Sequence, residues 1–212
     1  MKDLDKISPS VIRRLPRYYR YLTNLEKEGV SRISSKALSE TIGVTASQIR
    51  QDLNCFGGFG QQGYGYNISE LRREIADILD IKSSSNTILV GAGNLGRAVA
   101  THMPFEDLGF SLIGIFDSAP MFKGLKIKNL QISPMTEIAD FCIEKQPQVA
   151  ILCIPDDSAK QIVEELWGFG IRAFWNFTHY NILADYPTAV VENVHLSDSL
   201  MTLSYQLKFG IQ

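Results

Sequence analysis

Residues 91–96 read GAGNLG and follow the apolar run TILV of residues 87–90. A glycine-rich turn between a strand and a helix is where a Rossmann-type fold holds the pyrophosphate of a dinucleotide. Gly91 permits the tight turn, Gly93 lets the backbone approach the phosphates, and Gly96 lets the helix pack on the sheet. The start of the helix then faces the phosphates with its dipole and its free N–H groups. The sequence therefore predicts a dinucleotide site that begins only at residue 91.

A carboxylate in the following segment indicates which dinucleotide is bound. Asp117 ends the next strand pattern, FSLIGIFD of residues 110–117. A carboxylate at this place takes the ribose hydroxyls of NAD and repels the extra phosphate of NADP. We therefore expect NAD(H) as the cofactor. The expected contacts are Asp117 and the glycine turn, Gly91, Ala92, Gly93, Asn94, Leu95 and Gly96.

The rest of the second half alternates between strand and helix patterns. Strand patterns cover residues 87–91, 110–117, 148–155 and 171–177, and helical patterns cover 93–103, 134–146 and 157–170. This alternation implies right-handed crossovers and a parallel sheet. A last amphipathic helix is expected at residues 196–210, where Leu196, Leu200, Leu203 and Leu207 line one side. An apolar stripe at the end of a chain marks an interface with a partner.

Helical patterns dominate before the polar, serine-rich boundary KSSSN of residues 82–86. Ser8 is a good N-cap with Pro9 at the first helical position, and Pro16 should kink or shift the helix that follows. Two further helices, at residues 34–43 and 45–56, are joined only by a short turn at Gly43. The aromatic and glycine-rich stretch GGFGQQGYGYN follows, which we expect to form a hairpin, and then one more helix. This order predicts a helix-turn-helix with a wing.

The third of these helices has the surface that DNA recognition requires. Thr45 caps it, and Gln48 is expected to complete a capping box. Its apolar side consists of Ile49, Leu53 and Phe56. The opposite side carries Ser47, Arg50, Gln51 and Asn54. Amides can bond adenine and arginine can bond guanine in the major groove, so we expect this side to contact bases. The alternative is a three-helix cap with a merely solvated polar face.

Charge is distributed unevenly along a chain whose net charge is −2. Residues 1–82 carry 13 lysines and arginines against 10 acidic residues, whereas residues 83–212 carry 8 against 13. Within the first 53 residues the balance is 10 against 6. The placement suits a polyanionic partner. On charge alone, an ordinary solvated surface is the better explanation of this imbalance.

The composition excludes several other classes. No apolar run approaches the ~20 residues of a membrane span, and the N-terminus is too polar for a signal peptide. The three cysteines, Cys55, Cys142 and Cys153, lie far apart with no C-x-x-C pair. We therefore expect a reduced, cytoplasmic protein that contacts no membrane and binds no metal. Cys55 is more readily explained as a small buried residue than as an oxidant sensor.

The candidate acid–base residues do not form a catalytic arrangement. His102 follows the glycine turn on its helix and is expected near the phosphate end. His179 lies after a strand end, and His195 lies in a polar segment. No His–Asp or Lys–Tyr constellation stands out, so we expect no enzyme activity. Two alternatives stay open: a small NAD-dependent oxidoreductase with an N-terminal interaction domain, and a coenzyme-binding module that binds protein rather than DNA.

Motifs spread over essentially the whole chain resemble the Rex family of redox-sensing transcriptional repressors. They are, in order, RRLPRYYRYL, SSKAL, residues 48–52, GYGYN, GAGNLG, IFD, CIPD and NF. The resemblance implies an α/β protein with a winged helix-turn-helix domain (1–82), a Rossmann-type NAD(H)-binding domain (83–195) and a C-terminal helix (196–212) that swaps onto the partner of a homodimer. It implies binding to palindromic operators of fermentation, respiration and NADH-recycling genes, with release when NADH accumulates.

The resemblance also implies roles for particular residues. Arg13 and Arg14 are expected near DNA phosphates, and Pro155 of the CIPD motif beside the cofactor. Ser47, Gln48, Arg50 and Gln51 are expected in the major groove, and Tyr64, Gly65 and Tyr66 of the wing near the minor groove.

Two positions depart from the family pattern. Gln61 and Gln62 stand where many members have basic residues at the wing tip, and His102 stands where many have a tyrosine. For the redox switch we expect Asp198 to pair with Arg14 of the partner in one redox state. In the other state Asp198 should turn toward His102.

Overall fold

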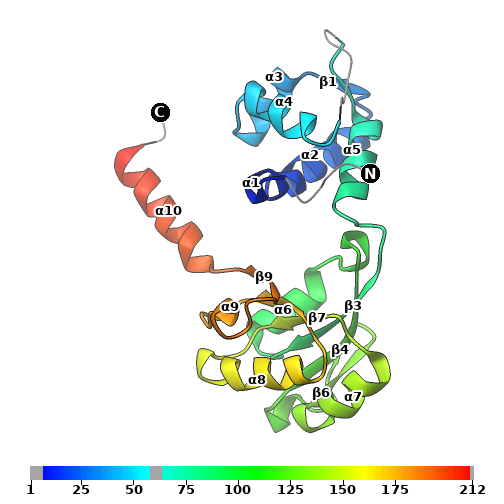
Figure 1. The fold of residues 1–212 in the computed structure, drawn as a ribbon, viewed down its shortest axis with the longest axis vertical. Coiled ribbons are helices and arrows are strands. Elements are labelled where there is room, and N and C mark those ends of the chain that lie inside the picture. The colour runs from blue at the N-terminus through cyan, green and yellow to red at the C-terminus, as the bar shows by residue number, and fades with distance from the viewer. Residues whose placement is uncertain (1–6, 58–63, 211–212) are drawn as a thin grey trace. The chain divides into compact units, whose positions relative to one another are not determined.

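Two units make up the chain, residues 1–82 and 83–212, and the computed structural model describes residues 7–57 and 64–210 (Figure 1). The helices of the first unit are α1 (Pro9–Ile12), α2 (Leu15–Lys27), α3 (Ser35–Ile42), α4 (Ala46–Asn54) and α5 (Ile68–Ile78). Its strands are β1 (Arg32–Ile33) and β2 (Tyr66–Asn67).

Local capping chemistry sets where these helices begin. The Ser8 hydroxyl accepts a hydrogen bond from the backbone N–H of Ser10, and Pro9 opens α1 as expected. Pro16 lies in the first turn of α2, so the chain breaks there into two helices, the interruption that this proline predicts. The Thr45 hydroxyl caps α4, and Gly43 ends α3 in the left-handed conformation (φ 74°). The predicted helix-turn-helix is confirmed.

The core of the first unit joins α2, α3, α4 and α5 around side chains that are almost fully buried. Its central members are Leu15, Tyr18, Leu22, Leu38, Ile49, Leu53, Ile68, Leu71 and Ile75. The antiparallel pair β1 and β2 closes one side, with Ile33 opposite Tyr66. The glycine-rich segment expected to form a hairpin falls largely on residues 58–63, outside the described residues. The described end of this segment forms β2, which pairs with β1. The sequence pattern did not predict β1.

The second unit is built on a seven-stranded sheet in the order β5-β6-β4-β3-β7-β8-β9. Its strands are β3 (Ser85–Val90), β4 (Phe110–Asp117), β5 (Lys126–Ile127), β6 (Leu130–Pro134), β7 (Val149–Leu152), β8 (Ala173–Asn176) and β9 (Val190–Asn193). Its α-helices are α6 (Asn94–His102), α7 (Ile138–Lys145), α8 (Asp156–Gly168), α9 (Ile182–Asp185) and α10 (Leu196–Phe209). Short 3-10 helices are η2 (Glu106–Leu108), η3 (Pro120–Phe122) and η4 (Met135–Glu137).

Alternating side chains of the central strand β3 serve two cores. Ile88 and Val90 pack with α7 and α8, whereas Leu89 packs with α6 on the other face. All strand pairs are parallel except β5 with β6. The chain runs from β3 to β4 on one side and returns later to β7 on the other. This reversal places a crevice at the carboxyl ends of β3, β4 and β7, the usual ligand site of such sheets.

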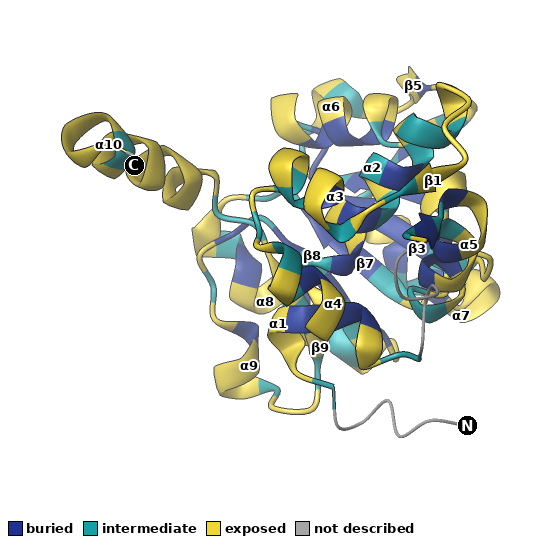
Figure 2. Cartoon of the chain, turned by 90° about the horizontal axis from the view of Figure 1, so that it is seen from above, coloured by how far each residue is buried: buried dark blue, intermediate teal, exposed yellow. Residues whose placement is uncertain are grey.

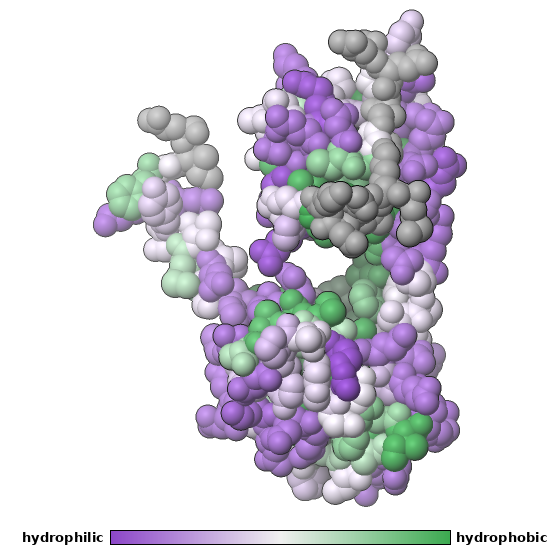
Figure 3. Space-filling view, in the orientation of Figure 1, coloured by the Kyte–Doolittle hydropathy of each residue, from purple (hydrophilic) through white to green (hydrophobic). Residues whose placement is uncertain are grey.

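Among the α-helices of the described residues, the last helix, α10, is the one without a buried residue (Figure 2). Its leucines are all at least 49% exposed, and Figure 3 shows apolar side chains on its open surface. None of the helices in the described part of the chain combines the length and the apolar character needed to cross a membrane.

Candidate cofactor site and nucleic-acid interface

The glycine turn after β3 has the geometry that its sequence predicts. Gly91 adopts a positive φ of 98°, and a side chain there would collide with the carbonyl of Cys153. A side chain at Gly96 would collide with the carbonyl of Gly91, so the helix packs against the turn only without one. A Cβ at Gly93 would meet nothing within 4 Å. The open space beside Gly93 belongs to the crevice and suits a phosphate group that approaches the backbone.

A cavity of about 500 Å³ lies at this crevice. Gly91, Gly93, Asn94, Leu95, Asp117 and Pro155 line it, so six of the eight residues expected at the cofactor border it. The other two, Ala92 and Gly96, are buried. Pro155 comes into place as the N-cap of α8.

Asp117 organises the turn as well as bordering the cavity. Its Oδ2 accepts a hydrogen bond from the backbone N–H of Ala92 at 2.5 Å, and its Oδ1 accepts one from Ala119 at 2.7 Å. Each carboxylate oxygen has a second lone pair for a ribose hydroxyl. The residues present therefore fit a dinucleotide whose ribose hydroxyls are free.

The cysteines separate into different environments. Cys153 lines the cavity, but burial raises the pKa of its thiol to about 12, which keeps it protonated and unreactive. Cys55 is exposed after α4, and its thiol donates to the carbonyl of Gln51 at 3.3 Å. The expectation that Cys55 is buried was wrong, because α4 ends one residue earlier and its apolar side turns away.

The histidines lie outside the cavity. His102 is the last residue of α6, about 12 Å along the helix axis from its start, so it is at the end opposite the phosphate-binding turn rather than near it. The ring of His179 approaches Asp156 at 3.0 Å, and its own backbone N–H donates to the same carboxylate at 2.8 Å. These contacts lower the pKa of Asp156. His195 stacks on His179 with ring centroids 5.1 Å apart.

The helix α4 presents the polar surface expected of it. Ser47, Arg50, Gln51 and Asn54 are exposed, while Ile49 and Leu53 are buried. Arg50 is held in part by a hydrogen bond from its Nη1 to the hydroxyl of Ser35 on α3, at 3.0 Å. Gln48 is only half-buried, and its amide does not fold back to the cap. It donates instead to Asp52.

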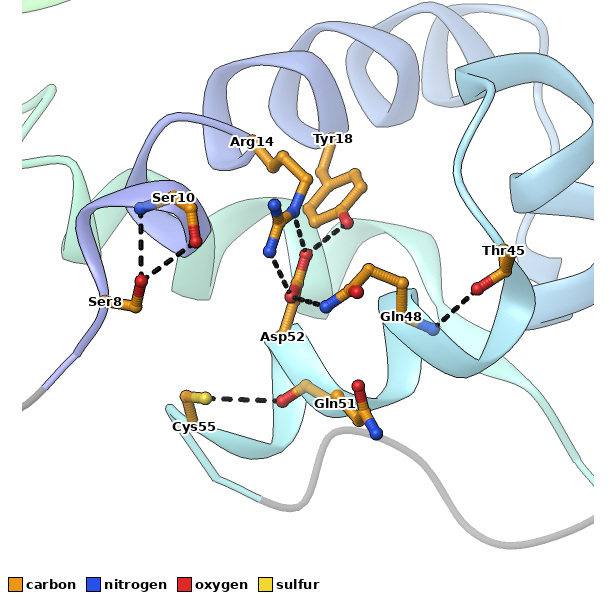
Figure 4. Close-up of polar contacts among 9 residues, drawn as sticks. All are labelled: Ser8, Ser10, Arg14, Tyr18, Thr45, Gln48, Gln51, Asp52 and Cys55. Carbon is orange, nitrogen blue, oxygen red and sulfur yellow. Dashed lines mark hydrogen bonds and ion pairs between the residues drawn. The ribbon is translucent and has the colours of Figure 1, made fainter.

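Asp52 is the centre of a buried polar cluster that the sequence motifs did not predict. It is fully buried and accepts hydrogen bonds from Arg14 (2.6 and 2.8 Å), the Tyr18 hydroxyl (2.6 Å) and the Gln48 amide (2.8 Å) (Figure 4). A signal was present: Asp52 falls beside the apolar side of a predicted amphipathic helix, where an unpaired carboxylate is costly. Its partners are brought to it by α2 and by the preceding turn of α4.

The Asp52 contacts change what can be expected of Arg14. In this chain two of its guanidinium nitrogens bind Asp52, and the side chain is 23% exposed. The phosphate and the Asp198 of a second copy that were expected at Arg14 would therefore have to share Arg14 with Asp52 or displace it. Asp198 is exposed in the first turn of α10, and its Oδ2 lies 3.7 Å from the Nδ1 of His195. Arg13 is exposed at the end of α1.

The described part of the wing needs one correction. Tyr66 is 8% exposed and packs into the core of the first unit, so its side chain is not free to reach a groove. Tyr64 is 70% exposed, and its carbonyl accepts a hydrogen bond from Arg32 at 3.3 Å. Gly65 has a positive φ of 70°, and a Cβ there would lie 2.6 Å from the carbonyl oxygen of Ile33. Gln61 and Gln62 lie outside the described residues.

Two family models match the chain. Residues 6–54 match the putative DNA-binding protein N-terminus, and residues 82–180 match the CoA binding domain. The redox-sensing transcriptional repressor Rex of Thermoanaerobacter pseudethanolicus is 51% identical over 207 residues, covering 98% of this chain and 92% of the relative. The Rex repressor of Clostridium perfringens (strain SM101) is 50% identical over 208 residues, covering 98% and 97%.

Solved structures of RSP, a Rex-family repressor, have the same fold. RSP in complex with β-NADH superposes with a TM-score of 0.87 at 48% identity, covering 96% of this chain and 95% of RSP. RSP in complex with β-NAD⁺ and operator DNA gives 0.86 at 51% identity, covering 95% and 93%. The chain shares about half of its residues with these Rex proteins over nearly its whole length, and it has the same fold. The chain therefore belongs to the Rex family of redox-sensing transcriptional repressors.

Proposed function

We propose that this protein is a repressor that binds palindromic operator DNA through its first unit and releases it when NADH binds to its second unit. The observation that carries the proposal is the presence, in one chain, of an exposed polar recognition surface on α4 and a dinucleotide crevice at Gly93. RSP has been crystallised with NADH and with NAD⁺ plus operator DNA, the two ligand states that such a function requires.

The α4 surface supplies the base contacts. Ser47, Gln48, Arg50 and Gln51 enter the major groove, where the arginine suits guanine and the amides suit adenine. Tyr64 and Gly65 of the wing lie near the minor groove. Arg13 and Arg14 contact phosphates, which position the protein without reading sequence. Genes of fermentation, respiration and NADH recycling are the proposed targets, and the cytoplasm is the proposed location.

The crevice takes NAD(H). Gly93 leaves space for the pyrophosphate at the start of α6, and Asp117 supplies the carboxylate for the ribose hydroxyls. A second phosphate on that ribose would meet the Asp117 charge, so NADPH is disfavoured. The family consists of transcriptional regulators, and the role of the crevice is to sense the cofactor rather than to catalyse its oxidation.

The two apolar faces of α10 support assembly into a homodimer. One face carries the leucines of residues 196, 200, 203 and 207, and the opposite face carries Met201, Tyr205 and Phe209. All of these side chains are exposed in a single chain. A helix with apolar stripes on opposite faces needs to be covered from two sides, as it would be when swapped onto a second copy. A two-fold dimer also matches a palindromic site.

The switch joins the two units through Asp198. In one redox state Asp198 pairs with Arg14 of the partner chain, in competition with Asp52, and in the other it turns toward His102. An exposed pair of this kind contributes only ~0–1 kcal/mol, so partial burial between subunits is required for a useful effect. Both Asp198 and His102 are exposed in the single chain, which leaves them accessible to such a partner.

One experiment separates this function from the two alternatives. A palindromic duplex is selected by the protein from a random pool, and binding is measured by gel shift with and without NADH. NADH oxidation is followed in parallel with a panel of small carbonyl substrates. We expect NADH to abolish the shift and no substrate to be turned over. Turnover of a substrate without DNA binding supports the oxidoreductase. The absence of both turnover and DNA binding supports the protein-binding module.

A further inference from the structure

We propose that Asp52 is a specificity-positioning residue, which holds the side-chain amide of Gln48 in one orientation so that Gln48 meets DNA as a hydrogen-bond acceptor. The inference rests on the proposed function, since it requires α4 to be the recognition helix. Asp52 is buried and acts only through Gln48, without touching a base itself.

The identity of the amide atom that faces Asp52 is fixed by chemistry. The Gln48 amide and Asp52 Oδ1 are 2.8 Å apart. An ionised carboxylate only accepts hydrogen bonds, so the facing atom must be the amide nitrogen. Burial raises the pKa of Asp52, but the hydrogen bonds from Arg14, Tyr18 and Gln48 outweigh this and hold it below its ordinary value. The carboxylate is therefore ionised at neutral pH.

Turning the amide around is unfavourable for two reasons. The charge-assisted hydrogen bond to Asp52 would be lost, and the amide oxygen would face a carboxylate oxygen at the same distance. Hydrogen bonds to charged groups are worth enough to disfavour the flipped amide by roughly 10- to 150-fold. Asp52 cannot move to accommodate a flipped amide. Arg14 donates hydrogen bonds to both of its carboxylate oxygens, and the Tyr18 hydroxyl donates to one of them.

The place of Gln48 on α4 makes this orientation matter for recognition. Gln48 is three residues past the N-cap Thr45, whose hydroxyl accepts from the Gln48 backbone N–H at 3.1 Å. Residues near the start of a recognition helix are those that contact base edges. Among the described residues no group donates to the Gln48 Oε1, which leaves it free to accept.

A fixed acceptor discriminates between bases in the major groove. Adenine N6 and cytosine N4 donate there, whereas guanine O6 and thymine O4 accept and would oppose Oε1. A glutamine whose amide turns freely can satisfy either kind of edge. Asp52 therefore converts an ambiguous side chain into one that selects adenine or cytosine at one base pair of each half-site.

The test is a base-pair scan. Each position of the selected half-site is replaced by the other three pairs, and affinity is measured by fluorescence anisotropy. At one position the wild type should prefer a base with a major-groove donor by roughly 5- to 150-fold. Asp52→Asn should lose that preference while keeping the others, because asparagine can present either its nitrogen or its oxygen to Gln48. Adding Gln48→Ala to Asp52→Asn should not change the base preference at that position any further.

Two further variants guard against a general structural effect. Tyr18→Phe removes another donor from the same carboxylate but leaves the Gln48 contact, so it should keep the preference. Gln48→Met removes the amide and leaves the Arg14–Asp52 pair, so it should lose the preference even if Asp52→Asn does not fold. Circular dichroism checks the fold of every variant.

The outcomes separate this inference from the proposed function. Equal weakening at all positions by folded Asp52→Asn, or an unchanged preference in Gln48→Met, overturns the positioning role. Arg50→Ala identifies which assumption has failed in that case. If Arg50→Ala alters specificity, α4 reads DNA and only the positioning role is wrong. If Arg50→Ala leaves affinity and specificity unchanged as well, the assignment of α4 as the recognition helix has failed.

Discussion

Individual side chains at the crevice perform more than one task, and Asp117 shows this most clearly. Its carboxylate fixes the glycine turn through Ala92 and Ala119 and also borders the cavity. The spacing of Asp117 from the glycine turn predicted the second task, because carboxylates recur at that place in dinucleotide sites. The first task, fixing the glycine turn, could not be predicted because its hydrogen bonds form only in the folded turn. Gly93 is the simpler case, since it contributes only the absence of a side chain.

Gly93→Val should abolish NADH binding and leave the fold intact. The new side chain would occupy the open space at the crevice where the pyrophosphate is expected, and nothing in the protein obstructs it within 4 Å of its Cβ. Calorimetry measures the binding and circular dichroism the fold. Gly168→Val is the matched control, since Gly168 also has open space around its Cβ but does not line the cavity. Undiminished NADH affinity in Gly93→Val would place the cofactor elsewhere.

Asp117→Ala should weaken NADH and narrow the difference between NADH and NADPH, because the repulsion of the second phosphate is removed. Titration of wild type and variant with both cofactors measures this. Because Asp117 also holds the turn, the ratio of the two affinities is the informative quantity rather than the loss alone. Equal affinity of the wild-type protein for both cofactors contradicts the assignment of Asp117.

Helices and strands with strong local signals were predictable, and those set by packing were not. Serine and threonine caps with helical periodicity located α3 and α4, and the apolar run of β4 was found at residues 110–117. The strand β1 was missed because it has two residues and pairs with β2 more than thirty residues away, whereas β2 lies in the segment expected to form a hairpin. The Asp52 network was missed for the same reason, since it forms only when α2 packs against α4.

The junction of α2 and α4 should make the first unit sensitive to acid. Because the pKa of Asp52 is lowered in the folded state, its contribution is complete above pH ~4, the ordinary aspartate range, and is lost as pH falls toward the lower folded-state value. Asp52→Asn should cost about 3 kcal/mol at neutral pH, and the difference from wild type should shrink in acid.

Urea unfolding at neutral and acidic pH, followed by far-UV circular dichroism, measures this difference. Both tryptophans, Trp167 and Trp175, lie in the second unit, so their fluorescence serves as the internal control and should respond to the substitution weakly. A stability difference that is constant across pH would show that Asp52 does not stabilise the unit through its charge.

Assembly of the proposed dimer depends on α10, whose two apolar faces are exposed in a single chain. Deleting residues 196–212 should yield monomers or aggregates, because the proposed dimer loses its swapped helix. Light scattering measures the mass. Ser197→Glu, on a polar flank of the helix, is the control and should leave the dimer intact. A truncated chain that stays a stable dimer would exclude the swap.

The switch predicts energetic coupling between Arg14 and Asp198 of the partner. NADH titrations of the operator complex for Arg14→Ala, Asp198→Ala and the double variant should show non-additive effects. Arg14→Ala also removes the pair with Asp52, so Asp52→Asn is the reference for that loss. If His102 is the alternative partner, release by NADH should vary with pH across the range where histidine titrates, and His102→Gln should remove that variation. Additive effects exclude the coupling.

Cofactor and operator are expected to oppose one another on one protein, so their effects on each other's binding must be reciprocal. Linkage requires that operator DNA weaken NADH binding by the same factor by which NADH weakens operator binding. Both affinities are measured on the full-length protein, NADH by calorimetry with and without duplex and duplex by anisotropy with and without NADH. NAD⁺ serves as the control cofactor. We expect NADH and operator DNA to weaken each other's binding by the same factor of at least tenfold, roughly 1.4 kcal/mol of coupling, and NAD⁺ to have a smaller effect. Operator affinity that is the same with and without saturating NADH would contradict it.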